Sequence, residues 1–83
     1  MSLEYYKKQM VDLRAKLQKE KDAKKKDNEY YARMVKFSST PSGKASYRKM
    51  KVDRAASHDR QIESIERQIE SCKDNIARER KRK

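Results

Sequence analysis

Apolar residues recur along the second half of the chain at alternating intervals of three and four positions. They occupy positions 62, 65, 69, 72 and 76, all isoleucine except Cys72. Such spacing follows the α-helical turn and draws one narrow apolar stripe along a helix. A stripe this narrow buries little surface by itself, so the pattern predicts a second helix packed against it. We call this row of inward positions the seam.

The first half of the chain repeats the same spacing. Its seam consists of Leu3, Tyr6, Met10, Leu13 and Leu17. Between the halves, the segment 38–43 is rich in serine and holds the only proline and the only glycine. Both residue types disfavour helix interiors. The sequence therefore predicts an all-α fold, an antiparallel two-helix coiled-coil hairpin. We expect two hairpins to dimerise into a four-helix bundle, with a helical protein partner as the alternative.

The ends of the helices follow from capping residues. Ser2 is a suitable N-cap for the first helix, and Thr40 followed by Pro41 suits the start of the second. Gly43 weakens that first turn, which favours a start nearer Ser46. The expected organisation is a single hairpin over 1–83, with a helix at 2–37, a turn at 38–45, a helix at 46–80 and a basic tail at 81–83.

Folding the chain at the turn predicts which residues meet. Leu17 should lie near Ile65 and Ile69. A second apolar cluster is expected beside the turn, from Tyr31, Met34, Phe37, Tyr47, Met50 and Val52. The residues expected to form the interaction seam are Leu13, Leu17, Ile62, Ile65, Ile69 and Ile76.

Between the two apolar regions, the seam of the first helix carries Glu20, Lys24 and Asp27. Their expected partners on the second helix are Ala55, His58, Asp59 and Ile62. Charged residues at seam positions reduce stability but fix the register of the helices. Asp27 should face His58, which we interpret as a hydrogen-bonded seam histidine. A pH-sensitive pair or half of a metal site is the alternative, although further metal ligands are missing.

The chain is strongly basic, with a net charge of +11 at pH 7. Cationic clusters attract phosphate backbones, so nucleic-acid binding is the alternative to a protein–protein interaction module. The candidate nucleic-acid contacts are Lys24, Lys25, Lys26, Lys44, Arg48, Lys49 and Lys51. The net charge is +5 in residues 1–40 (11 basic, 6 acidic) and +6 in residues 41–83 (13 basic, 7 acidic). The positive charge is therefore spread over both halves, and neither is a dedicated basic arm. No helix-turn-helix, zinc-finger or basic-zipper pattern is present.

Paired tyrosines stand at 5–6 and 30–31. Aromatic rings among cations can stack on single-stranded bases. Packing at the rim of a helical interface is the interpretation we favour for both pairs.

Enzymatic activity has no support in the sequence. The chain has no glycine-rich phosphate loop and no catalytic triad, and we expect no metal site and no cofactor. Cys72 is interpreted as a small core residue, with a disulfide between two copies as the alternative. A single cysteine, no apolar run of membrane-spanning length and no signal peptide favour a cytoplasmic protein.

The opening residues 1–8, MSLEYYKK, and the serine-rich turn followed by Lys44, Ser46 and Arg48 carry a family resemblance. The chain resembles the N-terminal coiled-coil hairpin segments of bacterial proteins in which a hairpin precedes a TIR-like or related nucleotide-binding domain. This resemblance implies a bacterial assembly or sensing segment and transfers no catalytic residue.

Overall fold

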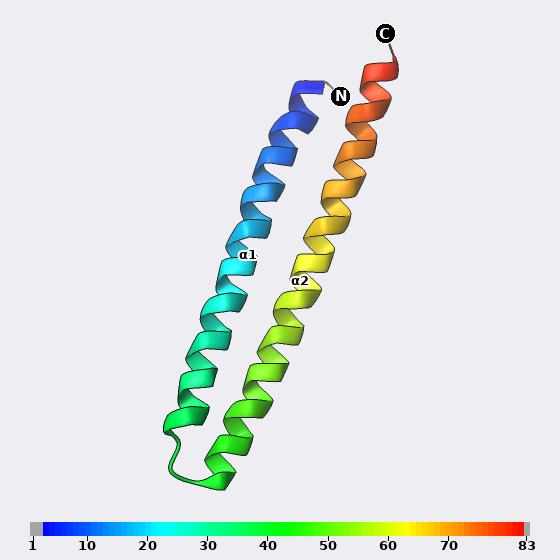
Figure 1. The fold of residues 1–83 in the computed structure, drawn as a ribbon. Helices are drawn as coiled ribbons and strands as arrows, with labels where there is room; N and C mark the ends of the chain where they lie inside the picture. Colours follow the sequence, from blue (N-terminus) through cyan, green and yellow to red (C-terminus); the bar gives the residue numbers. More distant parts are fainter. Residues whose placement is uncertain (1–2, 83) are drawn as a thin grey trace.

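A computed structural model describes residues 3–82. Helix α1 (Leu3–Phe37) and helix α2 (Pro41–Lys81) run antiparallel, side by side, and a short link joins them (Figure 1). The rod measures 66 × 14 × 12 Å. The predicted all-α helical hairpin is therefore confirmed. We call residues 30–52, around the link, the loop end, and the opposite end of the rod the open end.

Helix α1 ends at Phe37, as predicted, but α2 begins at Pro41, so the expected start at residue 46 is wrong. Thr40 is the reason. Its backbone is extended (φ −119°, ψ 145°), and its Oγ1 accepts a hydrogen bond of 3.0 Å from the Gly43 N–H. The Lys44 N–H donates to the Thr40 carbonyl at 3.0 Å. This cap, with Pro41 in the first turn, offsets the helix-weakening effect of Gly43.

Gly43 is required by close packing inside the link. A β-carbon at this position would collide with the hydroxyl groups of Ser38 and Thr40. A larger residue at position 43 would therefore have to displace the Ser38 side chain or the Thr40 cap.

Helix α2 continues through Lys81, one residue beyond the expected end, and Arg82 is its C-cap. Arg78, Arg80 and Lys81 in its last turn place positive charge where the helix dipole is negative. The expected cap at Ser2 and the last tail residue, Lys83, lie outside the described residues.

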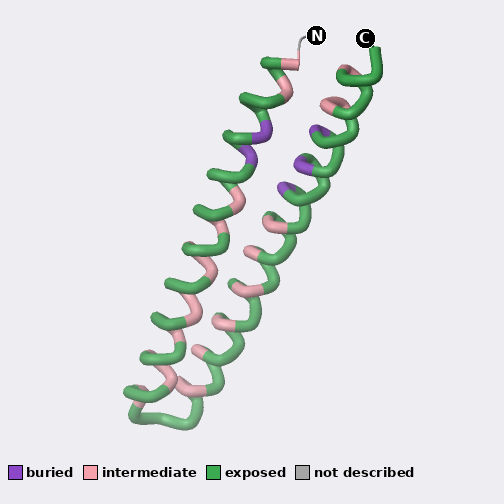
Figure 2. Tube along the Cα trace, turned by 45° about the horizontal axis from the view of Figure 1, so that its top comes forward, coloured by how far each residue is buried: buried purple, intermediate pink, exposed green. Residues whose placement is uncertain are grey.

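The seam runs the length of both helices (Figure 2). Buried and half-buried positions of α1 keep steps of three and four residues from Leu3 to Met34, and those of α2 do so from Ala55 to Glu79. Around Lys51 the α2 seam takes two consecutive steps of four, from Tyr47 to Lys51 and from Lys51 to Ala55. A four-residue insertion of this kind locally unwinds a coiled coil.

The apolar core lies at the open end. Its buried residues are Met10, Leu13, Ile65, Ile69 and Cys72, with Tyr6, Leu17 and Ile76 packed against them. Leu17 therefore contacts the cluster that contains Ile65 and Ile69, as the folded register required. The Cys72 thiol is 2% exposed and donates to the Tyr6 carbonyl at 3.1 Å. The thiol is a core group, held inside the hairpin.

The expected second apolar cluster at the loop end is wrong for three of its six members. Phe37, Met50 and Val52 are 75%, 45% and 67% exposed. The exposure of Met50 and Val52 follows from the step of four residues from Tyr47, which places Lys51 in the seam. Successive residues are about 100° apart around a helix, so Met50 and Val52 point to opposite flanks of the seam.

The fold depends on the buried isoleucines, which a single substitution can test. Ile65→Asp or Ile69→Asp should unfold the hairpin, since an unpaired buried charge costs about 3–5 kcal/mol. A small domain has little more stability than that. Circular dichroism during thermal unfolding measures the loss of helix.

The matched control is Ser64→Asp, which places the same charge on an exposed position of the same turn. It should keep its helix content. Unchanged melting temperatures in both isoleucine variants would contradict the assigned core.

Candidate functional site

A polar layer interrupts the seam between the apolar core and the loop end. Glu20, Lys24 and Asp27 occupy consecutive seam positions of α1, opposite His58 of α2. The His58 Nδ1 atom lies 2.6 Å from the Glu20 Oε1 atom, and the Nε2 atom lies 2.6 Å from the Asp27 Oδ2 atom. The expected juxtaposition of Asp27 and His58 is confirmed. The sequence also placed Glu20 in this layer without assigning it to a ring nitrogen.

These two contacts determine the protonation state of His58. An ionised carboxylate only accepts hydrogen bonds, and a neutral imidazole has one N–H to donate. Both contacts can therefore be hydrogen bonds only when the ring is an imidazolium. The hydrogen bonds to Asp27 and then Glu20 raise the pKa of His58, with a smaller opposing effect from burial. The His58 side chain is 16% exposed, so solvent competes little for these bonds.

Lys24 completes the layer. It lies between Glu20 and Asp27 on α1, and its Nζ atom is 2.6 Å from the Asp59 Oδ1 atom of α2. Positive and negative groups therefore alternate across the two helices. Sliding one helix along the other would separate all three ion pairs, so the layer fixes the register.

The alternative of a metal site at His58 gains no support from the described residues. No group of three or more potential ligands among residues 3–82 is arranged to hold a metal ion. Both ring nitrogens already face carboxylates, which leaves neither with a lone pair for a metal while the ring is charged.

The cations proposed as nucleic-acid contacts lie in different environments. Lys25, Lys26, Arg48 and Lys49 are exposed. Lys44 and Lys51 are half-buried at seam positions. A lysine at such a position can cover apolar surface with its stem and keep its ammonium group in water. Lys24 forms an ion pair with Asp59, and its role as a phosphate contact stays a prediction, as it does for the other six cations.

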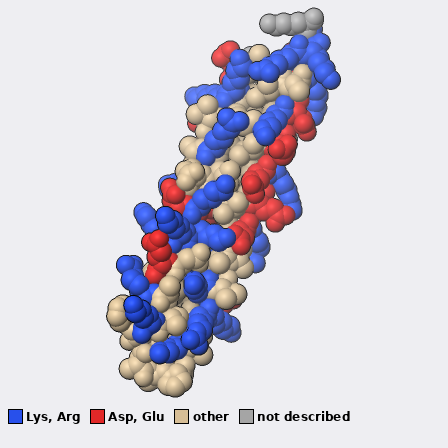
Figure 3. Space-filling view, in the orientation of Figure 1, with Lys and Arg blue, Asp and Glu red and all other residues tan. Residues whose placement is uncertain are grey.

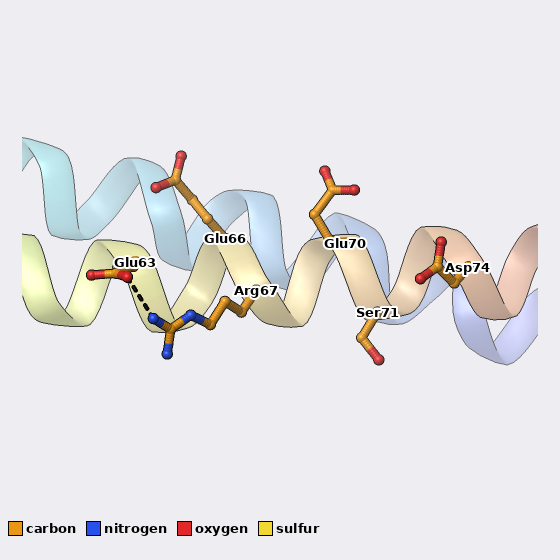
Figure 4. A pocket seen from close by; sticks show the side chains of 6 residues that line it. All are labelled: Glu63, Glu66, Arg67, Glu70, Ser71 and Asp74. Carbon is orange, nitrogen blue, oxygen red and sulfur yellow. Dashed lines mark hydrogen bonds and ion pairs between the residues drawn. The ribbon is translucent and has the colours of Figure 1, made fainter.

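An acidic row on α2 is a feature that the sequence analysis missed. Glu63, Glu66, Glu70 and Asp74 line a shallow hollow together with Arg67 and Ser71. Glu66 and Glu70 rise on one side of α2 and Ser71 points to the other (Figure 4). Figure 3 shows this acidic row beside the basic side chains of the same face. The sequence did contain a signal for this row, because the acids are three or four residues apart and therefore fall on one side of a helix.

A second groove lies between the helices on this face. Leu17 and Ile69 line it together with the charged side chains of Arg14, Glu66, Glu70 and Lys73. We call it the charged-rim groove. It leaves apolar surface of the seam open beside charges of both signs.

Comparisons with protein-family models, with curated proteins and with solved structures find no match to this chain. The resemblance of its opening residues to bacterial hairpin segments stays a prediction. Neither helix, over the residues described, has an apolar stretch long enough to cross a lipid bilayer.

The polar layer predicts that the hairpin loses stability as the pH rises. The pKa of His58 is raised in the folded chain, so the folded state binds more protons than the unfolded state does. The stabilisation is fully present below the pKa of an unfolded histidine, about 6.5, and disappears as the pH rises through the higher folded value. Urea unfolding at a series of pH values measures this slope.

Three variants make the test specific to the groups that face His58. His58→Asn should remove the slope in this range, while Glu20→Gln and Asp27→Asn should each lower the histidine pKa measured by NMR titration. Lys24→Gln and Asp59→Asn should change it less, because they contact each other rather than the ring. A wild-type hairpin whose stability rises over the same pH range would contradict the assignment.

Proposed function

We propose that the hairpin is a non-enzymatic protein–protein interaction module that assembles with a second copy of itself. The charged-rim groove is the observation that carries this proposal. Only five described residues are buried, in a rod 66 Å long. Small two-helix units gain stability by covering remaining apolar surface with another chain. The half-buried Leu17, beside the buried Ile69, supplies such a surface, and charged side chains surround it.

The charges of this face form two opposite rows. In a coiled coil, residues one and four positions after the first seam residue of each heptad share a flank. On this flank the charged residues within 7–25 of α1 are Lys7, Arg14, Lys21 and Lys25, and those within 59–70 of α2 are Asp59, Glu63, Glu66 and Glu70. Nearer the open end, the flank carries charges of the opposite sign, Glu4 on α1 and Lys73 and Arg80 on α2. The basic row of one helix therefore lies beside the acidic row of the other, as Figure 3 shows.

The two rows select one arrangement of the copies. A two-fold axis parallel to the rod stacks α1 of each copy on α2 of the other at the same level, which brings opposite rows together. An axis across the rod stacks α1 on α1 and sets basic rows against each other. We infer the first arrangement, a four-helix bundle with both loop ends at the same end.

Exposed ion pairs contribute little individually, about 0.2–1 kcal/mol. Two copies that each carry +11 also repel each other. The bundle should therefore be weak, with the half-buried Leu17 supplying apolar contact and the charge rows supplying orientation.

Charge reversal in one row tests this assembly. Glu66→Lys with Glu70→Lys should change the net charge of the acidic row from −4 to 0 and abolish the dimer, because the two opposite rows then no longer attract each other. Light scattering at several concentrations measures the mass. Asp12→Lys with Glu29→Lys adds the same charge at exposed positions outside the two rows, and this control should still dimerise.

Mixing gives the decisive result. Arg14→Glu with Lys21→Glu likewise changes the net charge of the basic row from +4 to 0, so this variant alone should also be monomeric. Combined with the Glu66→Lys, Glu70→Lys variant, it should form a mixed dimer. Two results would refute the proposal: a wild-type chain that is monomeric at all concentrations, or a mixture of the two variants that forms no mixed dimer.

A further inference from the structure

The positive charge is concentrated at the loop end. No acidic residue occurs between Glu29 and Asp53. This interval, residues 30–52, contains six cations, Arg33, Lys36, Lys44, Arg48, Lys49 and Lys51. It therefore supplies +6 of the net +11, and residues 1–29 and 53–83 supply +3 and +2. The hairpin folds 30–37 against 41–52, so these charges share one end of the rod, the lower end in Figures 1 and 3.

Exposed aromatic rings stand among these cations. Four of the six aromatic residues fall within residues 30–52. Tyr30, Arg33 and Phe37 are spaced three and four positions apart, which places them on one face of α1. Tyr30 is 48% exposed and Phe37 is 75% exposed. The Lys36 ammonium lies 5.8 Å from the centre of the Phe37 ring, a cation–π contact.

Helix α2 extends this face across the seam. Met50 and Arg54 lie on the flank of α2 that adjoins Tyr30 and Phe37, because antiparallel coiled coils place corresponding flanks together. Met50 is 45% exposed, and Arg54 is exposed. The resulting surface combines exposed rings, a thioether and cations.

We propose that the loop end binds single-stranded nucleic acid. Arg33, Lys49 and Arg54 would neutralise backbone phosphates, and Tyr30 and Phe37 would stack on unpaired bases. Aromatic platforms within a positive surface bind single strands with little dependence on sequence, because every base has a stacking face. Paired bases of a duplex are already stacked and cannot use these rings.

An anionic membrane fits this surface less well. The exposed rings lie along the flank of the rod, whereas the tip itself consists of the hydroxyl side chains of Ser38, Ser39 and Thr40. Inserting the tip into lipid would bury these polar groups at a cost. The site is also separate from the charged-rim groove, which lies at the open end on the opposite flank. Binding of nucleic acid therefore does not depend on dimerisation.

Fluorescence anisotropy with a labelled oligothymidylate of about 20 nucleotides tests the proposal on the full chain. Tyr30→Ala with Phe37→Ala should weaken binding at least roughly tenfold, since stacking contributes about 1–3 kcal/mol per base. The salt dependence should not change, because no charge is lost. Tyr5→Ala, which removes a ring of 49% exposure at the open end, is the control and should bind like the wild type.

The contribution of the cations is measured separately, by the salt dependence of binding. Arg33→Gln with Lys49→Gln should reduce the slope of log affinity against log salt by about 1.4, at about 0.7 per phosphate contact for single strands. Lys8→Gln with Lys19→Gln removes two exposed charges from the open half of α1 and should change the slope little.

Three results would overturn the proposal. One is unchanged affinity in the Tyr30→Ala, Phe37→Ala variant while circular dichroism shows an intact helix. Another is tighter binding to a duplex of the same length. The third is no binding to the oligonucleotide at low salt, including the case in which phosphatidylserine vesicles bind instead.

Discussion

The contact between two narrow apolar stripes holds this hairpin together. Each helix offers one stripe, and only at the open end are the facing residues large and apolar enough to exclude water. Outside this core, the inward positions carry charged residues and a few half-buried apolar ones, and most of the outward surface is polar or charged. A hairpin of this kind can tolerate many surface changes, because its stability depends on a few residues of one seam.

The chemistry of the seam divides the rod into three regions. At the open end, Ile65 and Cys72 pack within the apolar core. In the middle, His58 replaces packing with two charge-assisted hydrogen bonds, which specify register at the expense of burial. At the loop end, Lys51 occupies the seam and the apolar side chains Phe37 and Met50 are exposed. Stability, register and surface chemistry are thus assigned to successive segments of one continuous stripe.

Most of the fold was readable from the sequence because a coiled coil is nearly one-dimensional. The repeat from Ile62 to Ile76 set the stripe, and folding at Pro41 then predicted the pairing of Leu17 with Ile65 and of Asp27 with His58. Two features escaped this reading. Thr40 capped α2 earlier than Gly43 suggested, and the α2 seam changed step at Lys51, which exposed Met50 and Val52. Both depend on local geometry that a fixed repeat does not contain.

The sequence by itself determined that two helices form, where they break and which face of each is inward, because these properties follow from periodicity and from helix-breaking residues. Only the tertiary structure decided that both nitrogens of His58 meet carboxylates and that Lys24 turns to Asp59 rather than to solvent. It also decided which charges of α1 stand beside the acidic row of α2. The reason is that such contacts join residues more than thirty positions apart, and the exact rotation of one helix against the other sets them.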